Sequence, residues 1–207
     1  MDRLVVGFDL DGVLADFAYV FGKMAGLPSQ SAGAQEVWGK WPGLSRERTE
    51  LVWDRVALSG DVWTKPPPLV SEGEIAMMRD LVADGHKVVY VTNRGGVEPK
   101  EQTARWLAQY EFPQSGNVFV VEGGKLEVCL QQGVTHFIED RPRNLLEFQE
   151  GRLDWLVDRK LEIGGIEYTQ EPPDIYVRDW PYNRTPELDA VYRVSSVGEF
   201  IMEVRRG

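Results

Sequence analysis

The chain has 207 residues, which is enough for one hydrophobic core with a modest insertion. Hydrophobic residues make up 43% of it and seven residues are tryptophans, so the composition is that of a globular protein and excludes a disordered one. The formal net charge of −10 disfavours polymeric nucleic acid as a partner, because such binding depends on clustered Lys and Arg. A mononucleotide stays compatible with this charge, because it needs only a few local donors. The oligomeric state is left open.

The first predicted element is a buried strand that begins at Val5 and ends at two acids, Asp9 and Asp11. Side chains two residues apart on a strand share a face, and Gly12 then permits a sharp turn. Sheets of α/β proteins bind their ligands at the carboxyl ends of the strands. Two acids at this point therefore indicate metal binding and proton transfer.

Two other interpretations of this segment are an Asp-rich turn that merely closes a strand and a calcium-binding loop. The EF-hand pattern needs further oxygen ligands and a later glycine. Here Gly12 comes too early, and Val13 and Leu14 stand at ligand positions. We favour the catalytic interpretation, because three further polar segments follow predicted strands downstream.

Residues 17–69 interrupt the alternation of strands and helices along the chain. They predict a small helical cap inserted after the first strand. Helices are expected at Phe17–Met24 and Arg46–Leu58, with a region rich in Gly, Pro and Ser between them. Pro66–Pro68 predict an extended return to the core. The expected division is a core domain of residues 1–16 and 70–207 and a cap of residues 17–69.

After the cap, apolar strands alternate with helical segments. A capping box at Ser71 begins a helix that runs to about Asp84, with Gly85 as its stop. Such alternation predicts an α/β fold with a Rossmann-like, doubly wound parallel sheet. The remaining predicted strands are Lys87–Val91, Val118–Val121, Thr135–Ile138 and Ile175–Val177, and the remaining predicted helices are Glu98–Tyr110, Lys125–Gln132, Pro142–Gln149 and Val197–Val204.

The N-terminus leads directly into the first strand, and the sequence has neither a signal peptide nor a stretch of transmembrane length. We therefore expect a cytoplasmic protein without a membrane partner. The one cysteine, Cys129, cannot form an intramolecular disulfide. Its expected role is that of a small buried hydrophobic residue, and a reactive thiol is the alternative.

Four polar segments resemble the motifs of the haloacid dehalogenase superfamily of phosphotransferases. Asp9–Asp16 (Asp-Leu-Asp-Gly-Val-Leu-Ala-Asp) resembles the first motif and Thr92–Gly95 the second, while Lys125 fits the third and Glu139-Asp140 the acidic fourth. Each follows a predicted strand, and the order is that of the family. The resemblance covers most of the chain, and it implies that the inserted cap covers the active site and selects the substrate.

A narrower resemblance is to the 5'(3')-deoxyribonucleotidase branch, whose members dephosphorylate nucleoside monophosphates. It rests on three segments, which are Ile138–Pro142, Pro181–Arg184 and Tyr192–Ser196. This resemblance implies a nucleotide as the small phosphomonoester substrate.

By resemblance to the superfamily, Asp9 is the nucleophile that forms an aspartyl-phosphate intermediate. Asp11 protonates the leaving oxygen and then deprotonates the water that hydrolyses the intermediate. The implied cofactor is Mg²⁺, held by Asp9, by the main-chain carbonyl of Asp11 and by Asp140, with Glu139 as a candidate for a water-mediated ligand. The implied phosphate-binding groups are the Thr92 hydroxyl, the main-chain N–H of Asn93 and the Lys125 ammonium.

Several residues keep two interpretations. Arg94 either clamps the phosphate or pairs with an acid on the surface. Asn183 and Arg184 follow the last predicted strand, and the sequence leaves open whether they reach the pocket rim. The aromatic residues of the cap either stack on a nucleobase or form the cap's own core; they are Phe17, Tyr19, Trp38, Trp41, Trp53 and Trp63.

The leading hypothesis is a magnesium-dependent phosphomonoesterase for (deoxy)nucleoside monophosphates. The nearest alternative is a phosphatase for a sugar phosphate or another small metabolite, which would need more hydrogen-bonding side chains in the cap. A 3'-phosphatase on DNA ends is opposed by the acidic charge. A dehalogenase is disfavoured because those family members lack the second aspartate of the first motif. A phosphomutase, and a phosphate-binding module without activity, are further alternatives.

Overall fold

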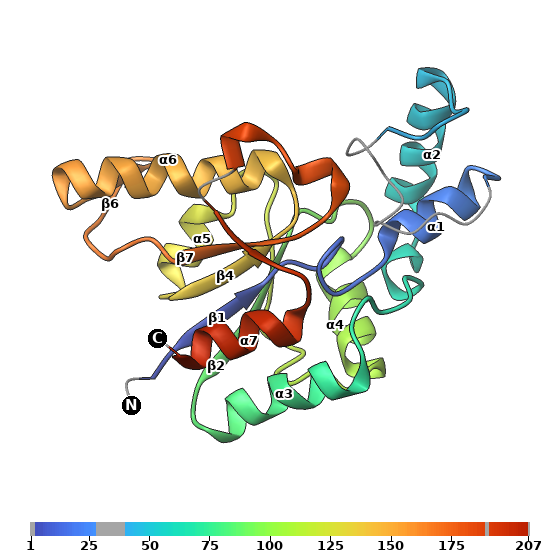
Figure 1. Cartoon of the computed structure of the whole chain (residues 1–207). Coiled ribbons are helices and arrows are strands. Elements are labelled where there is room, and N and C mark those ends of the chain that lie inside the picture. The colour runs from blue at the N-terminus through green and yellow to red at the C-terminus, as the bar shows by residue number, and fades with distance from the viewer. Residues whose placement is uncertain (1–2, 28–39, 189–190, 207) are drawn as a thin grey trace.

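The computed structural model describes residues 3–27, 40–188 and 191–206. Its centre is a six-stranded parallel sheet (Figure 1). In spatial order the strands are β3 (Val118–Val120), β2 (Lys87–Thr92), β1 (Val5–Phe8), β4 (His136–Glu139), β7 (Asp174–Arg178) and β8 (Tyr192–Val194). The predicted doubly wound α/β fold is confirmed.

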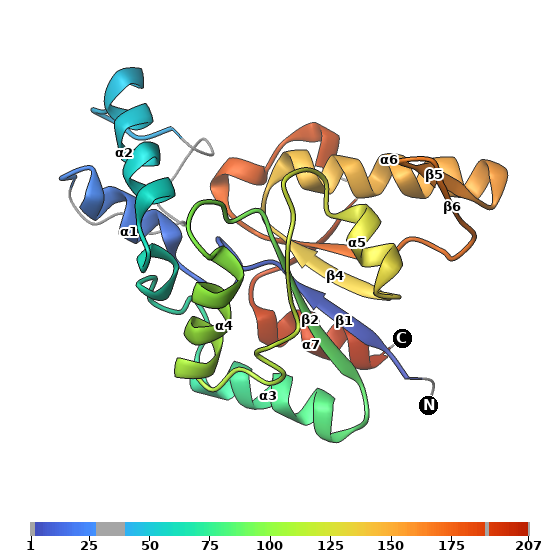
Figure 2. The same ribbon diagram turned by 180° about the vertical axis from the view of Figure 1, so that it is seen from behind.

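Helices cover both faces of this sheet. Figures 1 and 2 show α3 (Glu72–Ala83) and α7 (Val197–Arg206) on one face, and α5 (Leu126–Gln131) and α6 (Pro142–Asp158) on the other. The helix α4 (Pro99–Gln109) follows β2. None of the described helices has both the length and the apolar character that crossing a membrane requires.

Strand β2 explains why two layers of helices form. Val88 and Tyr90 pack into the core on one side of the sheet, whereas Val89 and Val91 pack into the core on the other side. All four side chains are fully buried. A strand of consecutive apolar residues is therefore buried on both faces, as is usual for parallel sheets.

The segment between β1 and α3 forms a unit with its own apolar core at the carboxyl edge of the sheet (Figure 1). It contains α1 (Phe17–Met24), α2 (Arg46–Leu58) and a short 3-10 helix, η2 (Val62–Thr64). Both long helices begin where the sequence predicts, because side chains of the preceding residues accept the first free N–H groups. Asp16 accepts from the Tyr19 N–H at 3.1 Å, and Ser45 accepts from the Arg48 N–H at 3.3 Å.

Most predicted elements agree with the structure, including the capping box at Ser71. The prediction that the helix from Pro142 ends at Gln149 is wrong, because α6 continues to Asp158. Gly151 lies inside this helix, where a Cβ atom would come within 2.3 Å of Leu126, so the glycine permits close packing of α6 on α5. Sequence analysis also did not predict β8 or the antiparallel hairpin of β5 (Leu161–Ile163) and β6 (Ile166–Tyr168).

Cys129 lies on α5 and is fully buried, as expected. Burial raises the pKa of its thiol well above the usual value. The side chain therefore packs as a small hydrophobic residue and is not a reactive thiol.

Candidate active site

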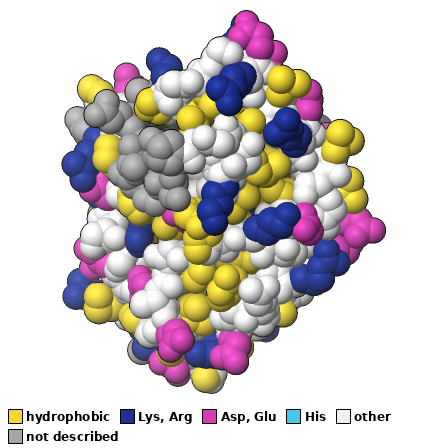
Figure 3. Space-filling view, turned by 90° about the vertical axis from the view of Figure 1, so that its right-hand side faces the viewer, with side chains coloured by type: hydrophobic (Ala, Val, Ile, Leu, Met, Phe, Trp, Pro, Cys, Tyr) yellow, Lys and Arg dark blue, Asp and Glu magenta, His cyan; other side chains and the backbone are white. Residues whose placement is uncertain are grey.

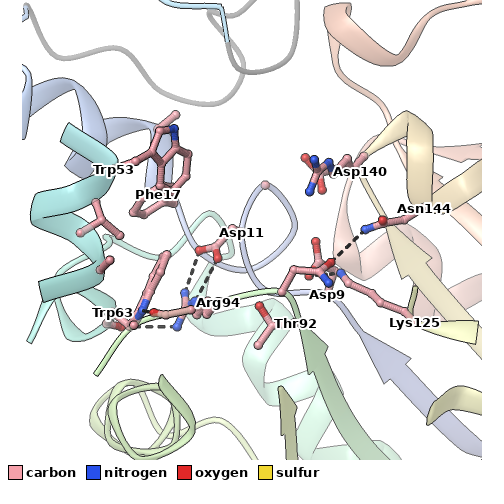
Figure 4. A pocket seen from close by; sticks show the side chains of 18 of the residues that line it. Asp9, Asp11, Phe17, Trp53, Trp63, Thr92, Arg94, Lys125, Asp140 and Asn144 are labelled. Atoms are coloured by element: carbon pink, nitrogen blue, oxygen red, sulfur yellow. Dashed lines mark hydrogen bonds and ion pairs between the residues drawn. The ribbon is translucent and has the colours of Figure 1, made fainter. Parts of the chain in front are cut away.

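Polar side chains from four loops converge at the carboxyl edge of the sheet (Figure 4). Asp9 follows β1, Thr92 ends β2, Asp140 follows β4, and Lys125 precedes α5. They line a cavity of about 250 Å³ whose opposite wall comes from the cap. The structure thus brings together these four residues of the motif segments.

Lys125 lies buried between two carboxylates. Its ammonium donates to Asp9 at 2.5 Å and to Glu139 at 2.7 Å, and only 1% of its side chain is exposed. Burial alone would lower the pKa of Lys125, but the two carboxylates raise it above its usual value, so the ammonium stays charged. The predicted phosphate-binding lysine is therefore part of a buried ion triad.

The two carboxylates of this triad differ in acidity. Burial and the neighbouring Glu139 raise the pKa of Asp9 to about 7, although Lys125 opposes this shift. Burial also acts to raise the pKa of Glu139, but the Lys125 ammonium and the main-chain N–H of Arg141 lower it to about 2. Glu139 is thus ionised at neutral pH and pairs with Lys125, and Asn144 donates a further hydrogen bond to it at 3.0 Å.

Asp140 lies beside this triad and is held from the loop after β7. The Tyr182 hydroxyl donates to its carboxylate, and Asn183 donates to its main-chain carbonyl at 2.9 Å. Burial, Glu139 and Asp9 raise the pKa of Asp140 well above its usual range. Burial is the largest cause of this shift, and the two neighbouring carboxylates add to it.

The loop after β1 approaches Asp140 so closely that only glycine fits at position 12. Gly12 has a φ of +91°, and a Cβ atom there would lie 2.1 Å from the Asp140 carboxylate. The Trp180 indole donates to the Gly12 carbonyl at 2.7 Å and ties this loop to the segment after β7. The glycine therefore lets the first and fourth motifs meet.

A metal ion suits this end of the pocket. Carboxylate oxygens of Asp9, Glu139 and Asp140 lie within 4.8 Å of one another, and all three residues are buried. Three carboxylates face one ammonium, and hard oxygen ligands of this kind are those that Mg²⁺ prefers. Because Glu139 is engaged by Lys125 and Asn144, Asp9 and Asp140 are the better candidates for direct ligation. The Asp11 carboxylate is not part of this group, and the contribution of its main-chain carbonyl stays a prediction.

Asp11 points toward the cap and away from Asp9 (Figure 4). Both of its oxygens accept from the Arg94 guanidinium, at 2.8 and 2.9 Å. Neither interpretation of Arg94 from the sequence describes it fully, because it pairs with an acid but is itself only 2% exposed. The partner is the predicted acid–base residue of the site.

The remaining phosphate-binding candidates are Thr92, the last residue of β2, and Asn93, which follows it. The Thr92 side chain is 1% exposed and lines the cavity. The Asn93 amide donates to the carbonyls of Val121 and Gly123 at 3.1 and 2.7 Å, so the side chain joins the loops after β2 and β3. Its side chain is therefore structural, and its predicted role concerns the main-chain N–H.

No protein-family model and no curated protein matches this chain, but solved structures do. A haloacid dehalogenase-like hydrolase from Streptococcus pneumoniae has a TM-score of 0.58 at 13% identity, covering 98% of both chains. A hydrolase of this family from Deinococcus radiodurans, with bound phosphate and sodium, has a TM-score of 0.56 at 14% identity, covering 99% of this chain and 96% of that one. An L-2-haloacid dehalogenase has a TM-score of 0.53 at 12% identity, covering 98% of this chain and all of the other.

The chain has the haloacid dehalogenase fold. In this fold the four motif segments of the sequence lie at the carboxyl ends of β1, β2, β3 and β4, where β1 and β4 are neighbours in the centre of the sheet. Asp9, Thr92, Lys125 and Asp140 therefore lie together at one edge of the sheet, and the roles that the resemblance implies for them stay predictions.

The cap supplies the opposite wall of the pocket, and its rings serve two purposes at once. Phe17 lies between Trp63 and Trp53, with ring centroids 4.7 and 5.6 Å away. Phe17, Trp63 and Trp41 belong to the cap's apolar core and also line the cavity, whereas Trp53 lines the cavity but is exposed. Figure 3 shows apolar side chains in a band across this face of the molecule. Tyr19 does not line the cavity, and Trp38 lies outside the described residues.

Three residues that support the candidate site were missed in the sequence. Asn144 stands four residues after Asp140, in the first turn of α6, and this spacing was the available signal. Glu147 accepts from the main-chain N–H groups of Lys125 and Leu126 at 3.0 and 3.1 Å, so it caps the helix that begins next to Lys125.

The third missed residue is Tyr182, which lines the cavity and contacts Asp140. The sequence left open whether its neighbours Asn183 and Arg184 reach the pocket rim, and neither of them lines the cavity. Asn183 is completely buried and bonded to main-chain carbonyls. Arg184 pairs with Asp179 on the surface.

Proposed function

We propose that this protein is a magnesium-dependent phosphomonoesterase that works through an aspartyl-phosphate at Asp9, and that its substrates are (deoxy)nucleoside monophosphates. The observation that carries the proposal is the pairing of Asp9 with Lys125 on the floor of a cavity that Asp140 and Thr92 also line. A nucleophilic carboxylate beside a fixed cation can receive a phosphate that would otherwise repel it.

The reaction follows from these positions. Asp9 attacks phosphorus and forms a P–O bond while the bond to the leaving oxygen breaks. Lys125 and the Thr92 hydroxyl stabilise the charge on the transferred phosphoryl group, and Asp11 gives its proton to the leaving oxygen. Water deprotonated by Asp11 then hydrolyses the acyl phosphate and regenerates Asp9. Bound Mg²⁺, held by Asp9 and Asp140, would neutralise further charge on the phosphate.

The cap wall supports a nucleotide over a sugar phosphate. Among the described residues, every cap side chain at the cavity is apolar or aromatic: Phe17, Ala18, Trp41, Trp53, Val56, Ala57 and Trp63. The Trp63 indole N–H is already used, because it donates to the Gly95 carbonyl at 2.8 Å. Such a wall offers flat surfaces for a base, and stacking of this kind contributes about 1–3 kcal/mol per base. A sugar would find few hydrogen-bond partners on it.

Dehalogenation is a second reaction to consider, because an L-2-haloacid dehalogenase has this fold. The presence of Asp11 speaks against it here, since by resemblance dehalogenases lack this aspartate. The buried group of Asp9, Glu139 and Asp140 also suits a metal-dependent reaction of a phosphate. We therefore propose a phosphatase and not a dehalogenase. We also propose that residues 17–69 act as its substrate-selecting cap and that the protein is cytoplasmic.

The test is phosphate release from deoxy- and ribonucleoside monophosphates and from sugar phosphates, each with magnesium and with EDTA. Magnesium-dependent release concentrated on the nucleotides would support the proposal. Release from sugar phosphates alone would keep the chemistry and reject the nucleotide. No release from any substrate by folded protein would leave a phosphate-binding module.

The matched variant for this assay is Asp9→Asn. We expect it to abolish turnover while the protein stays folded, because asparagine keeps the shape of the side chain but is not a nucleophile. Circular dichroism checks the fold, and near-normal phosphate release would contradict the assigned nucleophile.

A further inference from the structure

The Asp11–Arg94 pair also connects the core to the cap. Arg94 follows the end of β2 by two residues and has a fully buried side chain, whereas the side chain of Asp11 is 26% exposed. The Arg94 guanidinium lies over the Trp63 and Trp106 rings, with centroid distances of 5.0 and 5.6 Å. Two rings and one carboxylate thus hold the group in a single orientation, and Figure 4 shows Trp63 and Asp11 beside Arg94.

The donors of Arg94 are almost fully used within the protein. Nε and Nη2 donate to Asp11, while Nη1 donates to the Trp63 carbonyl at 3.4 Å and to the Thr103 hydroxyl at 3.1 Å. A guanidinium has five N–H groups, so these four bonds leave one. Bidentate recognition of a phosphate needs two parallel N–H groups. Arg94 is therefore unsuited to clamp the substrate in this arrangement.

The cap is attached at the same point. The Trp63 main-chain N–H donates to the Gln102 side chain at 2.9 Å, and the amide of Gln102 donates to the Ser59 and Val97 carbonyls. Gln102 is completely buried. Residues 59–64, near the end of the cap, are thereby fastened to the loop that carries Arg94 and to α4.

We propose that Arg94 is a positioning residue that couples the docking of residues 59–64 onto the core to the orientation of the acid–base residue Asp11. This inference rests on the proposed function, since it assigns Arg94 a part in the step that Asp11 performs. When residues 59–64 are docked, the Trp63 carbonyl and ring hold the guanidinium, and the guanidinium holds the carboxylate on the cap side of the pocket, where the leaving group lies. When they separate, Asp11 loses its fixed position.

The kinetic test compares Arg94→Gln and Arg94→Lys with wild type on a nucleoside monophosphate and on p-nitrophenyl phosphate. The alkoxide of the nucleotide needs a proton to leave, whereas p-nitrophenolate does not. We expect Arg94→Gln to lower kcat about 100-fold on the nucleotide and at most about threefold on the aryl phosphate, with partial rescue by lysine. Arg152→Lys, which alters a surface ion pair with Glu171 and Asp174, is the matched control and should change neither rate.

A double-mutant cycle separates the proposal from phosphate binding. In an Asp11→Asn background, Arg94→Gln should cost almost nothing further, because Arg94 acts through Asp11. Additive losses, or a rise in KM on both substrates with weaker inhibition by inorganic phosphate, would overturn the proposal.

A second measurement does not depend on enzyme activity. It therefore also tests the proposal if Arg94→Gln shows no change in the kinetic assay. Amide hydrogen exchange of residues 59–64 should be about tenfold faster in Arg94→Gln and unchanged in Arg152→Lys, because hydrogen bonds to the guanidinium are lost. Unchanged exchange in folded Arg94→Gln would overturn the coupling. If wild type releases no phosphate from any substrate, the proposed function fails, while exchange still decides whether Arg94 fastens the cap segment.

Discussion

Lys125 shows how one residue can serve both stability and reactivity. It neutralises two carboxylates that are almost fully buried, Asp9 and Glu139. Burial of unpaired charge is costly, so the triad is stable only as a unit. The same ammonium lies next to Asp9, where the proposed function places the phosphate of the substrate.

Replacing this lysine should therefore damage both properties. We expect Lys125→Met to lower the free energy of unfolding by about 3–5 kcal/mol, because Glu139 and Asp9 lose their cation inside the protein. Urea denaturation measures this loss. The control is Lys65→Met, which removes an exposed pair with Asp61 and should cost about 0–1 kcal/mol. Equal losses in the two variants would contradict the buried triad.

His136 gives a prediction on pH. Burial lowers its pKa below the usual 6.5, although Asp174 opposes the shift. Between the lowered value and 6.5 the unfolded chain binds a proton that the folded chain does not, so stability falls as pH falls through this range. The free energy of unfolding should therefore change less between pH 7 and about pH 5.5 in His136→Asn than in wild type. Between pH 7 and 8 the two proteins should change in parallel.

Among the elements, the loop after β1 and the loop after β7 depend on each other at Gly12. Two costs can be separated here, the left-handed backbone and the contact with Asp140. Gly43 has a similar φ of +80° but open space around it, whereas Gly12 would bring a Cβ atom to 2.1 Å from Asp140.

We expect Gly43→Ala to cost about 1–2 kcal/mol from backbone strain alone. Gly12→Ala should cost about 1–3 kcal/mol more, because Asp140 must move, and it should also weaken magnesium binding. Urea unfolding and calorimetric titration with magnesium measure the two effects. A Gly12→Ala protein that binds magnesium as wild type does would show that Asp140 is not a ligand.

Local sequence rules were sufficient for elements whose ends are determined by neighbouring residues. The helix after Ser71 was predictable because its capping box lies within four residues. The length of α6 was not, because Gly151 looks like a helix end until Leu126 is seen packed against it. The strand β8 was missed because it is short and its Tyr192 is 70% exposed.

The site was predictable to the same extent. Asp9, Thr92 and Asp140 follow apolar strands, and the edge of a parallel sheet brings such ends together. Partners that reach the site from distant segments left no local signal. Tyr182 contacts Asp140 across 42 residues and Arg94 contacts Asp11 across 83, and neither separation has a periodic pattern.

In the whole molecule, the pocket lies between a charged floor from the sheet and an aromatic wall from the cap. This division separates chemistry from recognition. Trp53 is the clearest test of recognition, because it lines the cavity, is 41% exposed and is far from Asp9 in the view of Figure 4.

We expect Trp53→Ala to raise KM for nucleoside monophosphates about 5- to 150-fold with little change in kcat, since stacking contributes about 1–3 kcal/mol. Leu58→Ala on the same helix is the control, because Leu58 is 80% exposed and does not line the cavity. Steady-state kinetics on nucleotides and on a sugar phosphate decide the matter. An equal rise in KM for the sugar phosphate would argue against base stacking.

The single cysteine has a practical consequence. Cys129 is the chain's only thiol, and it is fully buried with a raised pKa. Maleimide reagents should therefore leave the native protein unlabelled. Leu58→Cys on the cap and Val157→Cys on α6 would introduce two attachment points at positions that are each 80% exposed. A donor and an acceptor fluorophore at these points would report opening and closing of the cap during turnover, with the native thiol left in place.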